Sequence, residues 1–289
     1  MIALPRTAAP VIVVGADLSL GGRNALARAV EVARTSDASV VIVHAVHRLP
    51  PQALTPSDDQ DQDEAAGEAR AAMEELVGEA RTSGVDARLR FAASSAVRGL
   101  REAAAELAAH LVVVGARGRV MPDALLGSTA ERVAFHARSP VLLARRHASE
   151  AYRHVLVAVD ARGDVRRELD AARFVAPYAD VAFLHAYEAL HETTLALDGA
   201  TQASLSLYQR QARREARAAL IRQLADAGVS DPRLVLRHGN RRFVLEREAR
   251  RPSNELLVLE RSRSAARRFL LGGAARAVIA HGTVDVLLV

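Results

Sequence analysis

Two glycine-bearing turns in the first half of the chain hold the residues whose types and spacing could bind a ligand. The run Leu111-Val-Val-Val-Gly115-Ala-Arg-Gly118 reads as a buried strand that ends in a turn, and Gly127-Ser128-Thr129 precedes a helical pattern from Ala130. Glycine lets a backbone approach a ligand closely, and the first turn of a helix offers unpaired N–H groups to a phosphate. This order predicts a phosphate site built largely from main chain.

The composition narrows the chemistry of such a site. All 39 basic residues are arginine, and the chain has no cysteine. A phosphate-binding lysine, a Schiff base, a lysine general base and thiol chemistry are therefore excluded, so backbone N–H groups, arginine or a metal must meet phosphate charge. Arg117 and Arg119 flank Gly118. They are either phosphate partners or solvated loop residues.

The elements that must position these turns repeat along the chain. Val11–Asp17 matches His154–Asp160, and Val40–Ala45 matches Val181–Ala186. A chain of 289 residues is expected to hold about two domains. We therefore predict domains at 1–147 and 148–289, joined by a short polar linker near Arg145–Ala151.

Within the first half, short apolar runs alternate with helical patterns. We predict strands at 11–15, 40–46, 87–92, 111–115 and 141–145, and helices at 21–36, 62–83, 95–109 and 128–138. Near-continuous Val and Ile runs indicate strands buried on both faces, which is typical of a parallel sheet covered by helices. The predicted fold class is α/β, with two tandem doubly wound five-stranded parallel-sheet domains. Ligands of such sheets bind at the carboxyl ends of strands where the winding reverses.

The acidic segment from Pro50 to Asp63 is either a metal loop or a solvated loop leading into a helix N-terminus. The matching region of the second half, 191–209, has no acidic cluster. This favours the solvated loop, and we predict no metal site. No apolar run approaches the ~20 residues of a membrane span, the start has no leader-like pattern, and the lack of cysteine fits a reducing compartment. We expect a cytoplasmic protein.

With these residues in view, both halves resemble universal stress protein domains, and the resemblance runs from about Val11 to Val289. Nucleotide-binding members carry G-x2-G-x9-G-[ST] after the fourth strand. Gly115-x2-Gly118 fits, but eight residues precede Gly127 where that pattern has nine, and the usual proline near Gly15 is absent. The resemblance implies an adenine nucleotide α-hydrolase-like fold, with the two domains packed as a pseudo-twofold pair.

The resemblance also implies a bound ATP, alone or with Mg²⁺, in the first domain. The strand-end aspartate would contact the nucleoside, the main chain after the second strand would meet the adenine, and the glycine turns would hold ribose and phosphates. The implied residues are Gly15, Ala16, Asp17, Ala45, Gly115, Arg117, Gly118, Gly127, Ser128 and Thr129. Asp17 has a second reading as a capping residue for the helix near Leu20. No catalytic residue is implied, so any enzyme activity is at most slow ATP hydrolysis.

The second half departs from the pattern. Glu260-x2-Arg263 stands where the first two glycines should be, and Gly272-Gly273 replaces the glycine–hydroxyl pair. A carboxylate facing a triphosphate is repulsive, so we predict a degenerate, nucleotide-free domain in which Asp160 is a turn or cap residue. His44 and His185 recur at strand ends, and a hydrogen-bonded framework role is favoured over a switch or ligand because no triad spacing surrounds them.

Two functions follow as expectations. The first is a nucleotide-dependent signalling or protective factor under stress, and the alternative is a nucleotide-free scaffold that binds a protein partner. The final apolar strands, Val141–Leu143 and Val286–Leu288, are exposed-edge candidates that we expect to pair across the pseudo-twofold, with a homodimer left open. The whole +5 charge excess lies in residues 148–289. Nucleic acid is nevertheless disfavoured, because aromatic residues for base stacking are scarce.

Overall fold

A computed structural model describes residues 9–45, 56–116, 128–161, 163–189, 192, 197–261 and 273–289, without the side chains of 56–65 and 128. It divides into two compact units, Met1–Ala151 and Tyr152–Val289. The division falls at the far end of the polar segment that the sequence marks as a linker. Among the described residues, no helix has the length and apolar character needed to cross a membrane.

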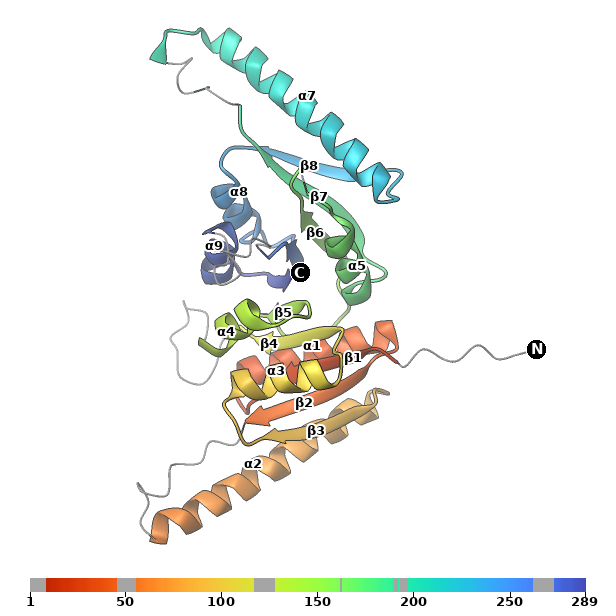
Figure 1. Cartoon of the computed structure of the whole chain (residues 1–289), viewed down its shortest axis with the longest axis vertical. Coiled ribbons are helices and arrows are strands. Elements are labelled where there is room, and N and C mark those ends of the chain that lie inside the picture. The colour runs from red at the N-terminus through yellow and green to blue at the C-terminus, as the bar shows by residue number, and fades with distance from the viewer. Residues whose placement is uncertain are drawn as a thin grey trace, which may run out of the picture. The chain divides into compact units, whose positions relative to one another are not determined.

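The first unit is a doubly wound parallel sheet (Figure 1). Its elements in chain order are β1 (Val11–Gly15), α1 (Leu20–Ser36), β2 (Ser39–Ala45), α2 (Pro56–Thr82), β3 (Ala87–Ala92), α3 (Ala96–Glu106), β4 (Leu111–Gly115), α4 (Ser128–His136) and β5 (Val141–Ala144). The strand order is β3-β2-β1-β4-β5, and every pairing is parallel. The predicted fold class is confirmed, and the winding reverses between β1 and β4.

The second unit repeats this arrangement. It consists of β6 (His154–Ala158), α5 (Arg166–Val175), β7 (Asp180–Tyr187), α7 (Gln202–Asp226), β8 (Arg233–His238), α8 (Arg241–Glu248), β9 (Leu256–Leu259), α9 (Gly273–His281) and β10 (Asp285–Leu288). Its strand order is β10-β9-β6-β7-β8, again parallel. Val155 pairs with Val181 as Ile12 pairs with Val40, so the registers define equivalent residues in the two units.

The central strands explain why their sequences lack a polar–apolar alternation. Ile12, Val13 and Val14 of β1 are fully buried, and the residues of β4 from Leu111 to Val114 are nearly so. Helices cover both faces of each sheet, so every side chain of these strands points into a core. Burial on both faces therefore explains why continuous Val and Ile runs in the sequence indicate parallel strands.

The predicted start of the second helix is wrong. Helix α2 begins at Pro56 rather than at residue 62, so the acidic run from Asp58 to Asp63 lies in its first turns and not in a loop. Proline suits the first helical position because its missing N–H would have no helical partner there, and acidic residues are stabilised by the helix dipole at an N-terminus. Both features favour extension of the helix toward its N-terminus.

Candidate functional site

The carboxyl ends of β1 and β4 lie side by side at the point where the first sheet changes direction. Gly15 ends β1 beside Val114, and Gly115 follows as the last residue of β4. The chain leaves these two strands toward opposite sides of the sheet order, and ligands of doubly wound sheets bind at such a reversal. The predicted residues Gly15, Ala16, Asp17, Ala45 and Gly115 therefore share one edge of the sheet.

Asp17 organises the turn between β1 and α1. Its Oδ1 accepts a hydrogen bond from the Ser19 backbone N–H at 3.1 Å and another from the Ser19 hydroxyl. The Ser19 Oγ in turn accepts from the Gly22 N–H at 3.1 Å, which makes Ser19 the N-cap of α1. Asp17 thus supports the cap without being the cap itself. Its Oδ2 has no hydrogen bond with any described residue, which leaves an acceptor for a ligand hydroxyl.

Two glycines at this edge are required by packing. A Cβ on Gly115 would lie 2.3 Å from the Gly21 carbonyl oxygen, and one on Gly22 would lie 2.2 Å from the Asp17 carbonyl oxygen. A Cβ on Gly15 would instead lie 2.8 Å from Leu100 Cδ1 of α3, the end of a flexible side chain that can move. The end of β4 and the first turn of α1 therefore meet backbone to backbone, with no side chain between them.

The Gly21-Gly22 pair was not identified as part of the site from the sequence. The available signal was its position directly after Ser19-Leu20, where two glycines in a first helical turn have no capping purpose. Helix propensity disfavours glycine there by about 1 kcal/mol each. Two such residues in sequence indicate a close approach of another backbone.

The two recurring histidines hold the ends of equivalent strands. His44 Nδ1 lies 3.0 Å from the Ala16 carbonyl oxygen, and His185 Nδ1 lies 3.0 Å from the Val159 carbonyl oxygen. Because a carbonyl oxygen can only accept, Nδ1 carries the hydrogen in both rings. The framework role favoured from the sequence is confirmed. Ala45, directly after His44, is the last residue of β2.

The remaining predicted residues belong to the connection from β4 to β5. Ser128 begins α4, and Thr129 beside it is exposed. Arg117, Gly118 and Gly127 lie outside the described residues, so their predicted contact with phosphate stays a prediction. The second unit's Arg263 and Gly272 lie outside the described residues in the same way.

At the equivalent edge of the second unit, Asp160 corresponds to Asp17. Its Oδ2 lies 3.4 Å from Arg241 Nη1 at the start of α8. Its carbonyl oxygen accepts from Gln223 Nε2 at 2.9 Å and from the Gly163 N–H at 3.0 Å. The carboxylate that keeps one oxygen unbonded among the described residues of the first unit is therefore engaged by an arginine here, and the Gly163 bond to the Asp160 carbonyl fits the predicted turn role.

The glycine and alanine that end β4 are also replaced in the second unit. Glu260 and Arg261 directly follow β9 and occupy the positions of Gly115 and Ala116 in the first unit. The equivalence is shown by the backbone, because the Arg261 N–H donates to the Val289 carbonyl oxygen as the Ala116 N–H donates to the Ala144 carbonyl oxygen. Burial, together with the nearby Arg167 cation, lowers the pKa of Arg261 to about 10. Large charged side chains thus stand where a glycine and an alanine allow close backbone packing in the first unit.

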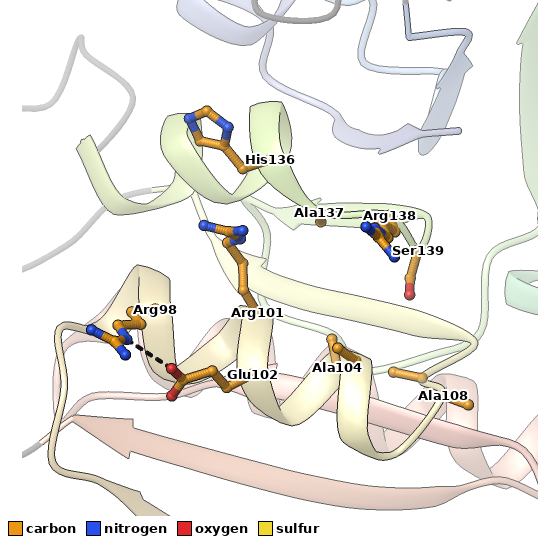
Figure 2. Close-up of a pocket in the computed structure, with 11 residues that line it drawn as sticks. Arg98, Arg101, Glu102, Ala104, Ala108, His136, Ala137, Arg138 and Ser139 are labelled. Atoms are coloured by element: carbon orange, nitrogen blue, oxygen red, sulfur yellow. Dashed lines mark hydrogen bonds and ion pairs between the residues drawn. The ribbon is translucent and has the colours of Figure 1, made fainter.

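A groove of about 730 Å³ lies elsewhere in the first unit, between α3 and α4 (Figure 2). Alanines such as Ala104 and Ala108 line much of it, and an Arg98–Glu102 ion pair of 2.7 Å spans one side. Figure 2 shows Arg101 of α3 beside the α4 residue His136. The groove contains none of the residues predicted for the nucleotide.

Comparison with known proteins identifies the class. The family model described as "Universal stress protein family" matches residues 10–145 and again residues 151–289, so the chain belongs to the universal stress protein family and carries two of its domains. No curated protein matches the sequence.

Two solved structures resemble the whole chain. A functionally unknown protein from Pseudomonas aeruginosa PAO1 is 20% identical, with a TM-score of 0.68, over 98% of this chain and 92% of that one. A universal stress protein from Archaeoglobus fulgidus DSM 4304 is 19% identical, with a TM-score of 0.67, over 98% of each chain. At these identities the likeness shows the two-domain fold.

Proposed function

We propose that the first unit binds ATP at the carboxyl ends of β1 and β4, and that the protein acts in the cytoplasm as a nucleotide-dependent signalling or protective factor under stress. The observation that carries this proposal is the open Oδ2 of Asp17 at the point where the sheet reverses. A carboxylate oxygen there can accept a hydrogen bond from a ribose hydroxyl.

The remaining contacts follow from the neighbouring residues. The main chain of Ala45 ends β2 beside β1 and would meet the adenine edge. Gly118, Gly127, Ser128 and Thr129 would hold phosphate oxygens, with Arg117 as a charged donor. Mg²⁺ would neutralise phosphate charge when it accompanies ATP. We assign no catalytic residue, and any hydrolysis would be slow.

The second unit is proposed to bind no nucleotide. Arg241 engages Asp160, and Glu260 and Arg261 stand where glycine and alanine stand in the first unit. A ligand would have to displace these side chains before it reached the backbone. The second unit would then serve as a structural partner for the first.

The nucleotide proposal is tested by calorimetric titration of the full chain with ATP and Mg²⁺. Gly118→Val should abolish binding, because a β-branched side chain blocks the approach of phosphate and disfavours positive φ. Gly272→Val, a companion change at the second unit's counterpart of Gly127, should leave the affinity unchanged. Equal affinities of wild type and Gly118→Val would remove the site assignment.

A nucleotide-free scaffold is the second candidate function. The eight residues between Gly118 and Gly127 favour it, because the loop is one residue shorter than in nucleotide-binding members. A wild-type protein that neither titrates with ATP nor carries an adenine nucleotide after purification, by mass spectrometry of the denatured sample, would support the scaffold and exclude the first proposal.

We further propose that the edge strands β5 and β10 pair, so that each unit covers the apolar edge of the other. Both strands are short, and apart from Asp285 at the start of β10 they are apolar, and such an edge tends to recruit another strand. An isolated fragment 1–147 should then self-associate in light scattering, and truncation before Pro140 should abolish this association. A fragment that stays monomeric at high concentration would contradict the pairing.

A further inference from the structure

Helices α2 and α7 occupy equivalent places in the two units, and each is much longer than the strand that follows it. Helix α2 has 27 residues and α7 has 25, whereas β3 and β8 have 6 each. At ~1.5 Å per helical residue and ~3.3 Å per strand residue, a helix near 40 Å faces a strand near 20 Å. Figure 1 shows both helices running beyond these strands.

The buried residues of the two helices lie toward their C-terminal ends. In α7 only Leu220 and Leu224 are buried. Among the described side chains of α2, the buried residues are Met73, Leu76, Val77 and Ala80. The N-terminal part of α7 therefore contributes a long exposed surface that its own unit does not cover.

The two helices carry opposite charge. Helix α2 holds nine acidic residues and two arginines, whereas α7 holds five arginines and two acidic residues. The net charges are therefore −7 and +3. The helix dipole accounts for the acidic residues in the first turns of α2, but not for the carboxylates farther along that helix or for the arginines in the middle of α7.

Four of the five arginines of α7 form one stripe, which we call the arginine stripe. Its members are spaced i, i+3, i+4 and i+7, so they share a face of the helix. They are Arg210, Arg213, Arg214 and Arg217. All are exposed, and none has a hydrogen bond or ion pair with the described residues.

Helix α2 presents a matching acidic stripe, defined by Glu68, Glu75 and Glu79. Spacings of 7 and 4 residues keep these carboxylates on one face. All three are exposed, and their side chains have no ion pair with the described residues, although the neighbouring Glu74 pairs with Arg70 at 3.2 Å. Among the described residues of its own unit, each stripe thus lacks a partner of opposite charge.

We propose that two copies of the chain associate by laying the arginine stripe of one copy against the acidic stripe of the other. Charge complementarity accelerates such an encounter and fixes its register. Each copy carries one stripe of each sign, so a two-fold arrangement would form the contact twice. A nucleic acid would use the arginine stripe alone and would be repelled by α2, whereas a second copy accounts for both stripes. This proposal is independent of the nucleotide site.

The test uses sedimentation velocity of the full chain at low salt and at about 1 M salt, where screening acts within ~3 Å. The wild type should associate at low salt and dissociate at high salt. Arg213→Glu/Arg217→Glu and Glu68→Arg/Glu75→Arg should each weaken association about tenfold, since each reverses two exposed pairs. Folding of each variant is checked by circular dichroism.

Mixing the two variants gives the decisive result. In the mixture, the reversed α7 meets the reversed α2, and the unchanged α7 meets the unchanged α2, so association should return to the wild-type level. Arg101→Glu/Arg138→Glu, which makes the same charge change in the groove between α3 and α4, should leave association unchanged.

Three results would overturn the proposal. A wild type that stays monomeric at low salt would remove the interface, including the case in which it binds a DNA duplex through α7. Loss of association in each variant without recovery on mixing would show that the stripes do not face each other between copies. If Arg101→Glu/Arg138→Glu weakened association as much as the stripe variants do, the effect would come from the net charge of the chain and not from the stripes.

Discussion

The strand-end edges of the two units differ although the frame around them is shared. Both keep an aspartate after the first strand and a histidine whose Nδ1–H holds the neighbouring strand end. In the first unit Asp17 supports a serine cap and keeps one oxygen open, whereas in the second Asp160 faces Arg241. The aspartate and histidine that hold the backbone together are present in both units, whereas the glycine and alanine at the end of β4 are replaced by Glu260 and Arg261 in the second. In a duplicated fold, a residue that recurs in both units thus indicates a structural role, whereas residues that differ between the units indicate where a ligand site is to be sought.

The largest difference should appear when a side chain is added at the end of β4. Gly115→Ala should destabilise the first unit by about 2–3 kcal/mol, because the new Cβ would lie 2.3 Å from the Gly21 carbonyl oxygen. Glu260→Ala at the equivalent position should change stability by about 0.5 kcal/mol or less. Urea denaturation of the full chain measures both. Equal losses would mean that the two edges are packed alike.

Removing the charge of the strand-end aspartate should lower the ATP affinity in the first unit and have no effect in the second. Asp17→Asn keeps an oxygen for Ser19 but weakens the acceptor for a ribose hydroxyl, so ATP affinity should fall about tenfold. Asp160→Asn should leave the affinity unchanged. Calorimetric titration compares the two. A loss of affinity in Asp160→Asn would place nucleotide in the second unit and reverse the assignment.

The turn after β1 in the first unit and the turn after β6 in the second are stabilised by different groups. A substitution in one turn should therefore destabilise only the unit that contains it. Ser19→Ala removes the N-cap of α1 and should cost about 1 kcal/mol. Gln223→Ala removes the bonds to the carbonyl oxygens of Asp160 and Gly163 and should cost a similar ~1 kcal/mol. Amide hydrogen exchange should rise only in the unit that carries the change, and exchange that spreads to both would argue against independent turns.

The smallest effect is expected at the Arg241–Asp160 pair. Both side chains are about half exposed, so Arg241→Ala should alter stability by about 0.5 kcal/mol or less. Thermal unfolding at low and high salt measures this. A large, salt-insensitive loss would show that the pair is a structural element of the second unit rather than a replacement for a ligand.

The strands were predicted well from the sequence because a strand that is buried on both faces is an uninterrupted run of apolar residues. The predicted 11–15 and 111–115 are the observed β1 and β4, and the predicted 40–46 differs from β2 by one residue at each end. The start of α2 was missed because a proline and an acidic run suit both a loop and a helix N-terminus. Local pattern could not choose between them.

Contacts between distant residues were beyond the reach of the sequence pattern. Gly115 was identified as a ligand glycine, but its contact with Gly21 depends on how β4 lies against α1. Arg241 and Asp160 are separated by 81 positions, and nothing local to either predicts that they meet. Asp17 and Ser19 are only two residues apart, so the alternative capping role was within reach of sequence reasoning.

The direct contact between the end of β4 and the first turn of α1 makes this part of the first unit mechanically stiff. A side chain between two elements can change rotamer and absorb a small shift, but two touching backbones have no such slack. A displacement of Gly115 toward α1 therefore has to displace the backbone at Gly21 as well. Because Gly115 has no Cβ, the end of β4 and the first turn of α1 are coupled directly through their backbones and cannot shift independently.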